Sequence, residues 1–210
     1  MAQEGLHKHA FWLYGVIVGL AIKHAVETVL PSLLASPFTR AWESLPEAVR
    51  LFLFLVIIIR FYLGYATYFD DVYYAADADT KYPTKNYLVD FLFGFAHFLI
   101  FLVWAMSLQI PNRPLLFLGL LGAILLYDVV WFLACRDYAG ARRMKLWMLI
   151  NVATFILSSV IYLATTAVGG KETLAEVLAY IPVLLVSGID IAELTSQRRI
   201  IADWLQGFIR

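Results

Sequence analysis

The sequence has few charged residues and almost no cysteine. Asp, Glu, Lys and Arg make up only 15% of its 210 residues, and sixteen cationic side chains balance sixteen acidic ones. Because no basic face with interleaved aromatic residues stands out, we do not expect nucleic acid as a partner. The one cysteine, Cys135, has no second thiol for an internal disulfide, and we interpret it as a packing residue.

Motifs typical of membrane and soluble enzymes are also missing. The sequence contains no HExxH, no GxSxG nucleophile elbow, no Walker loop and no dinucleotide fingerprint. Asp77 and Asp79 are spaced like the first ligands of a calcium loop, but Lys81 occupies the next ligand position. The sequence therefore predicts neither a catalytic site nor a metal site.

Hydrophobic residues, in contrast, make up 62% of the chain, well above the roughly 45–50% of soluble domains. At about 20 residues per membrane crossing, we expect an all-α integral membrane bundle in the lipid bilayer, a single domain over residues 1–192. Its apolar runs predict six transmembrane helices at 11–34, 49–68, 88–108, 114–135, 146–168 and 174–192. Charges and a proline weaken the last run, so five helices are the alternative, although Thr173 and Glu176 are spaced as a capping box at its start.

The distribution of cations favours six helices over five. With six, ten Lys and Arg side chains fall on one side of the membrane, against Arg40, Arg50, Arg113 and Lys171 on the other. This bias predicts a plasma (inner) membrane protein with both termini cytoplasmic. Tryptophan prefers the headgroup level of a membrane. The six predicted helices place five tryptophans near helix ends, in agreement with this preference: Trp12, Trp131 and Trp147 on the cytoplasmic side, and Trp42 and Trp104 on the outer side.

Two segments outside the apolar runs suggest contacts beyond the bundle. In residues 193–210, apolar residues including Trp204 recur at helical spacing, which predicts an amphipathic helix on the membrane surface or an oligomer contact. The loop 69–86 is a candidate surface for a soluble cytoplasmic protein, because it carries four acidic residues: Asp70, Asp71, Asp77 and Asp79.

The first apolar run carries charges near its middle, where a membrane helix is expected to have none. A single stripe contains residues at four-residue steps: Gly15, Gly19, Lys23, Glu27 and Pro31. The two glycines form a GxxxG pattern that favours close helix packing, and ionisable groups at this depth tend to face an interior or a partner. We interpret the stripe as a packed polar interface; the alternative is that Lys23 and Glu27 simply neutralise each other.

Polar residues of five apolar runs lie at depths that predict a cluster, with Asp90 at its mouth: Lys23, His24, Arg60, His97, Asp128 and Asn151. We expect Asp128 to be the counter-ion of Arg60, because their estimated depths differ by about one helical turn. His97 is a candidate proton relay between Asp90 and the charges of the first run.

These residues favour a small channel or transporter for ions or protons, working as a homo-oligomer. The alternative is a membrane-embedded effector or regulatory subunit, for example of a bacterial defence or stress module, that acts with a soluble partner. A third hypothesis is a haem-binding redox protein or a lipid-modifying membrane protein; haem bound by His24 and His97 needs the two imidazoles on facing helices at similar depth.

Overall fold

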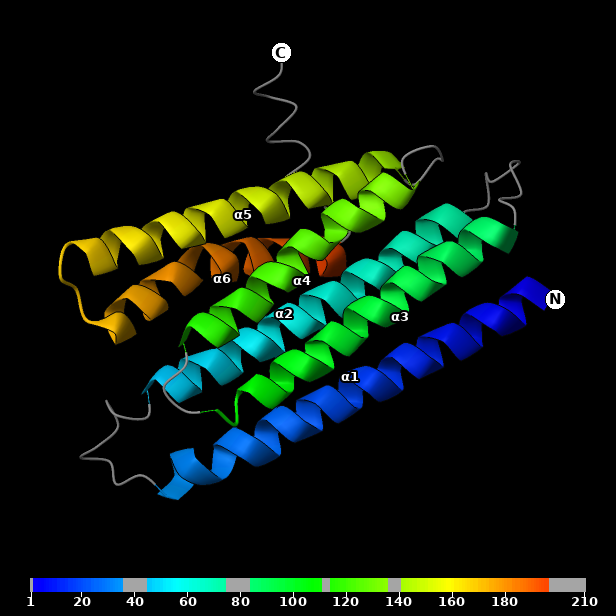
Figure 1. The fold of residues 1–210 in the computed structure, drawn as a ribbon. Coiled ribbons are helices and arrows are strands. Elements are labelled where there is room, and N and C mark those ends of the chain that lie inside the picture. Colours follow the sequence, from blue (N-terminus) through cyan, green and yellow to red (C-terminus); the bar gives the residue numbers. More distant parts are fainter. Residues whose placement is uncertain (1, 36–44, 75–83, 111–113, 136–140, 197–210) are drawn as a thin grey trace, which may run out of the picture.

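The computed structural model describes residues 2–35, 45–74, 84–110, 114–135 and 141–196, and in these ranges the chain is helical without strands (Figure 1). Its six long helices are α1 (Ala2–Ala35), α2 (Leu45–Phe69), α3 (Thr84–Ser107), α4 (Pro114–Cys135), α5 (Ala141–Ala167) and α6 (Glu172–Ser196). Each contains a stretch long and apolar enough to cross a membrane. The predicted integral membrane bundle is therefore confirmed, with six such helices in the described part.

Helix α1 lies at one edge of the bundle (Figure 1), and its inner face contributes Tyr14, Ala21 and Ala25 to the core. Helix α2 packs against α6, which packs against α5; α5 in turn packs against α4, and α4 against α3. Helix α1 covers the seam between α2 and α3. We call the end of the bundle that holds the start of α1 and the end of α6 the terminal end, and the other the opposite end.

Helix α6 forms although three residues argued against it in the sequence. Glu176 and Asp190 are buried and ion-paired with arginines of α2, and Pro182 lies within the continuous helix. The predicted capping box is wrong, because α6 already begins at Glu172 and the Glu176 carboxylate is bound to Arg50. Pairing across the bundle offsets part of the cost that these charges would have in lipid.

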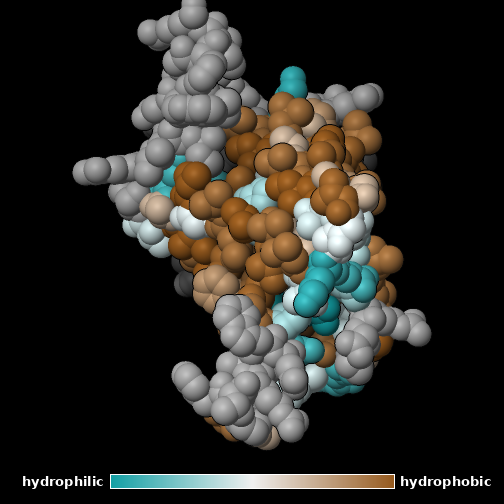
Figure 2. Space-filling model, turned by 90° about the vertical axis from the view of Figure 1, so that its left-hand side faces the viewer, coloured by the Kyte–Doolittle hydropathy of each residue, from teal (hydrophilic) through white to brown (hydrophobic). Residues whose placement is uncertain are grey.

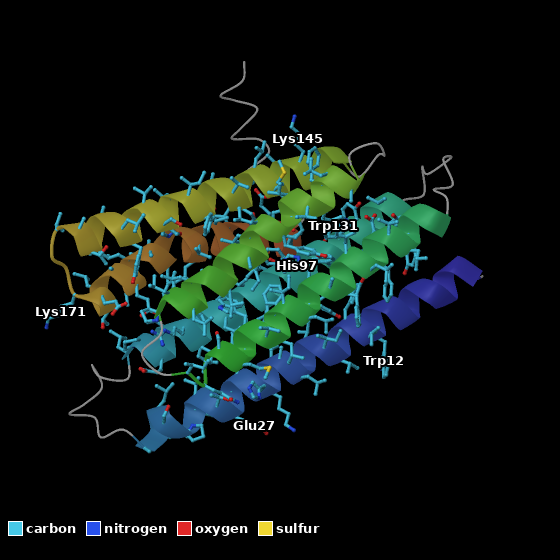
Figure 3. All side chains as sticks on the ribbon, viewed as in Figure 1. Trp12, Glu27, His97, Trp131, Lys145 and Lys171 are labelled. Atoms are coloured by element: carbon cyan, nitrogen blue, oxygen red, sulfur yellow. The ribbon has the colours of Figure 1, made fainter. Side chains whose placement is uncertain are left out.

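The core is built largely from aromatic rings. Trp104 and Trp131 are fully buried, and their indole N–H groups donate to the Phe117 carbonyl (3.1 Å) and to Asp90 (2.8 Å). Both residues lie near the last turn of their helices, as predicted, but their rings point into the bundle, where each indole finds a hydrogen-bond acceptor. Trp12, in contrast, is 70% exposed and projects from α1 (Figure 3).

Trp147 crosses from α5 to α2 and requires a glycine there. Its ring stacks on Phe61 with centroids 5.5 Å apart, and a Cβ atom added at Gly64 would lie only 1.6 Å from the indole. Trp147 therefore fills part of the interior between α5 and α2. The outer surface is largely hydrophobic, with hydrophilic patches between, as Figure 2 shows for the face at the opposite end.

Candidate functional site

Five buried side chains from five different helices form one polar cluster near the terminal end, which we call the interior network: Arg60 (α2), His97 (α3), Asp128 (α4), Asn151 (α5) and Asp190 (α6). The network lies between the helices, as His97 in Figure 3 illustrates. Its members were spread over the sequence by as many as 130 positions. Four of them were predicted to cluster, and the structure brings these four together.

Arg60 is at the centre of the interior network and is completely buried. Its Nε donates to Asp190 Oδ2 at 2.6 Å, and its Nη2 donates to Asn151 Oδ1 at 2.7 Å. The guanidinium also lies over the rings of Phe61 and Trp147 at 5.3 and 5.8 Å. The expected ion pair with Asp128 is therefore wrong: the counter-ion is Asp190, which the sequence offered only as a residue that weakened the sixth span.

Asn151 connects Arg60 to Asp128. The amide oxygen accepts from the guanidinium while its nitrogen donates to Asp128 Oδ2 at 2.5 Å. The other oxygen of Asp128 lies 3.8 Å from His97 Nδ1, and the same ring nitrogen is 2.8 Å from the Tyr65 hydroxyl. A row of polar groups thus runs from Asp190 to Tyr65, hydrogen-bonded at every step except the 3.8 Å contact between Asp128 and His97.

The formal charges of the interior network do not balance. Arg60 contributes one positive charge, whereas Asp128 and Asp190 contribute two negative charges when both are ionised. Within the described residues, no Lys or Arg forms an ion pair with Asp128. A cluster buried among apolar side chains favours neutrality, so one added proton, on His97 or on Asp128, would balance the charge. This makes the His97–Asp128 contact the place where the network can take up or release a proton.

Asp90 extends the polar region towards the terminal end. Its carboxylate accepts from Tyr68 (2.9 Å), Tyr73 (2.6 Å) and the Trp131 indole (2.8 Å). Trp131 in turn stacks on Tyr65, with centroids 4.7 Å apart and rings nearly parallel. Asp90 and His97, predicted to share one face of α3, are thus linked through two aromatic side chains.

A second buried ion pair lies near the opposite end. Arg50 binds Glu176 with two bonds, Nε to Oε1 at 2.5 Å and Nη2 to Oε2 at 2.9 Å, and Tyr180 donates to the same carboxylate. Sequence reasoning missed this pair because Arg50 was counted with the cations of the outer loops. The signal available was Glu176, an acidic residue inside an apolar run that needed a partner.

An apolar layer separates the two buried charge clusters. On α2, Phe54 and Ile57 lie between Arg50 and Arg60, and both are completely buried. The Phe54 ring packs on Trp104 with centroids 5.2 Å apart, and Phe101 is buried beside it on α3. The interior network is therefore separated from the opposite end by packed aromatic and aliphatic side chains.

The charged residues of α1 take no part in the interior network. Lys23 and Glu27 form an ion pair of 3.8 Å on the outside of the bundle, where their side chains are 66% and 65% exposed. Helix α1 packs inwards through another face, with Tyr14, Ala21 and Ala25 fully buried. The prediction that these charges join His97 in one polar path is therefore wrong: they share a face, as expected, but that face points outwards, as Glu27 does in Figure 3.

The exposed pair is costly in this position. Lys23 follows Trp12 by eleven residues in the membrane-spanning stretch Trp12–Ala35. A lysine at the centre of a membrane helix costs roughly 2.5–3.5 kcal/mol on insertion scales, and lipid tails offer no hydrogen bonds in return. The mutual ion pair recovers part of this cost, as the alternative interpretation of the stripe required.

The two histidines proposed for haem have separate environments. His24 Nε2 lies 2.7 Å from Gln109 Nε2 just beyond α3, whereas His97 is enclosed by the rings of Phe61, Phe101 and Tyr127. The Tyr127 ring centroid is only 4.6 Å from that of the imidazole. The packing around His97 therefore does not fit a second imidazole with a haem between them.

The other predicted contact surfaces fall mostly outside the described residues. Asp77, Asp79 and the greater part of the segment 193–210 lie outside, as does the side chain of Asp71. Asp70 is exposed at the start of a π-helical turn, Asp70–Tyr74, that continues α2. These predictions stay open.

No protein-family model, no curated protein and no solved structure matches this chain. The function is therefore inferred from the geometry of the site alone.

Proposed function

We propose that this protein is a small membrane transporter that binds a proton at the His97–Asp128 contact as part of its cycle. The observation that carries the proposal is the charge imbalance of the interior network, which has two carboxylates for one guanidinium. A site that becomes neutral by taking up one proton within a membrane bundle is a usual component of proton-driven transport.

The surroundings of the network agree with a gated site rather than an open channel. The hydrogen-bonded groups extend from Asp90 towards the terminal end, whereas the apolar layer with Phe54 and Trp104 closes the route to the Arg50–Glu176 pair. Transport then requires a second arrangement in which this layer opens. Such alternation is the general way in which a buried site exchanges access between two sides.

Proton flux into proteoliposomes tests the proposal. Purified protein is reconstituted with a pH-sensitive dye inside the vesicles, and a potassium diffusion potential drives protons inwards. We expect flux in the wild type and loss of at least about 90% of it in Asp128→Asn, which cannot exchange a proton at this position. Glu172→Gln is the matched control, because it makes the same chemical change at an exposed residue at the start of α6.

A second function is favoured by a different observation, the outward Lys23–Glu27 pair. Charges on the outside of a membrane helix suit a subunit that assembles with another membrane protein, as a regulatory or effector subunit does. If well-folded wild type and Asp128→Asn both show no flux above protein-free vesicles, the transporter proposal is wrong and the subunit hypothesis takes its place.

A further inference from the structure

The outer face of α1, which we define by Gly19, Lys23, Glu27 and Pro31, is exposed on the surface of the described bundle. Lys23 and Glu27 are about two-thirds exposed, and their single contact of 3.8 Å is longer than a good charge-assisted hydrogen bond. Each ammonium and carboxylate therefore keeps most of its bonding capacity unused. Lipid tails cannot use this capacity, so the face is incomplete in a single copy.

Gly19 lies on the same face as the charges and leaves room for another helix to approach closely. A Cβ atom added there would meet no atom within 4 Å, so packing inside the chain does not require a glycine. A glycine at an open position of a helix lowers helix propensity and gives nothing back within the monomer. It does allow another helix backbone to come close, which is the role of small residues in membrane helix pairs.

We propose that two copies of this chain pair through the outer faces of their α1 helices, with Lys23 of each copy bound to Glu27 of the other. Copies inserted in the same direction are related by an axis along the membrane normal, so their α1 helices run parallel. Lys23 and Glu27 lie one helical turn apart on each copy. They then form two ion pairs between the copies, one on each side of the axis, beside the close contact at Gly19. The face is complementary to itself, which is the requirement for a two-fold interface.

The choice of a second copy rests on this charge pattern. Lipid headgroups lie at the membrane surface, whereas Lys23 and Glu27 lie well inside the span Trp12–Ala35, where a second copy supplies both charges at the required spacing. The pairing is independent of proton binding, because the interior network lies on α2 to α6 and does not include α1. Either proposal can therefore fail without the other.

Cysteine cross-linking tests the arrangement with the native charges in place. In a Cys135→Ser background, Gly19→Cys is oxidised in proteoliposomes at a low ratio of protein to lipid. Val160→Cys on α5, 55% exposed, is the matched control for random collision. We expect a disulfide-linked dimer at position 19 that exceeds the control at least about tenfold. Equal cross-linking at both positions overturns the proposal.

Counting copies by single-molecule photobleaching tests the charges and the glycine. Lys23→Glu and Glu27→Lys should each lower the dimer fraction, and the double swap, which restores opposite charges in both pairs, should recover it. Gly19→Leu should abolish the dimer, whereas Gly119→Leu, at an equally open position on α4, should leave it unchanged. Single copies at every density in the wild type, or a double swap as monomeric as the single changes, overturns the pairing.

Discussion

Helix α2 carries two buried arginines ten residues apart, and they are bound in different ways. Arg50 gives both of its bonds to one carboxylate, Glu176, so its charge is neutralised by a single partner. Arg60 divides its bonds between Asp190 and Asn151, and Asn151 leads on to a second carboxylate, Asp128. The first site is a closed pair that fixes α2 to α6. The second has one acidic group too many, which allows its protonation to change.

The largest effect is expected at the closed pair. Glu176→Gln leaves the Arg50 guanidinium buried without a counter-ion, and no second carboxylate is bound to it in the described structure. Removing one partner of a buried ion pair costs about 3–5 kcal/mol. We expect a loss of this size in the free energy of unfolding, measured by denaturant titration in detergent micelles. A loss below about 1 kcal/mol would show that Arg50 is not dependent on Glu176.

A smaller effect is expected for the same kind of change at the shared site. Asp190→Asn removes the ion pair of Arg60. The Asp128 carboxylate stays connected to Arg60, because Asn151 is hydrogen-bonded to both residues. Because the guanidinium keeps an acidic neighbour, we expect a loss of about 2 kcal/mol in the same titration. If Asp190→Asn costs as much as Glu176→Gln, then Asp128 does not compensate, and the two arginines are equivalent.

The smallest effect on stability is expected at Asp128 itself. Asp128→Asn removes the carboxylate that has no Lys or Arg ion-paired to it among the described residues, and the new amide oxygen still accepts from Asn151. We expect the free energy of unfolding to change by less than about 1 kcal/mol. A loss above about 3 kcal/mol would mean that Asp128 is needed as a counter-ion, as the sequence alone had suggested.

The sequence was sufficient for the architecture but not for the pairing inside it. Apolar runs of the right length located all six helices, because length and hydropathy are properties of single segments. Glu176 and Asp190 entered only as weaknesses of the last segment, since their arginine partners are 126 and 130 positions away. Nothing in the local pattern of α6 indicates which distant residues it faces.

The direction of the α1 stripe was also beyond sequence reasoning. Spacing at four-residue steps placed Gly19, Lys23 and Glu27 on one face, but the opposite face is small as well, with Ala21 and Ala25. Both faces allow close helix packing, so the period alone does not say which one meets the bundle. The direction of the Trp131 ring was ambiguous in the same way, because an indole near a helix end can face the lipid headgroups or a polar interior.

The pairing of α2 with α6 has a consequence for the synthesis of the protein. Arg50 and Arg60 enter the bilayer with the second helix, whereas Glu176 and Asp190 arrive only with the sixth. Before α6 is present, the guanidinium groups of Arg50 and Arg60 lack their carboxylate partners, and neither is stable in lipid. A chain truncated before α6 would keep both charges unpaired, so α6 decides whether α2 is stable in the bilayer.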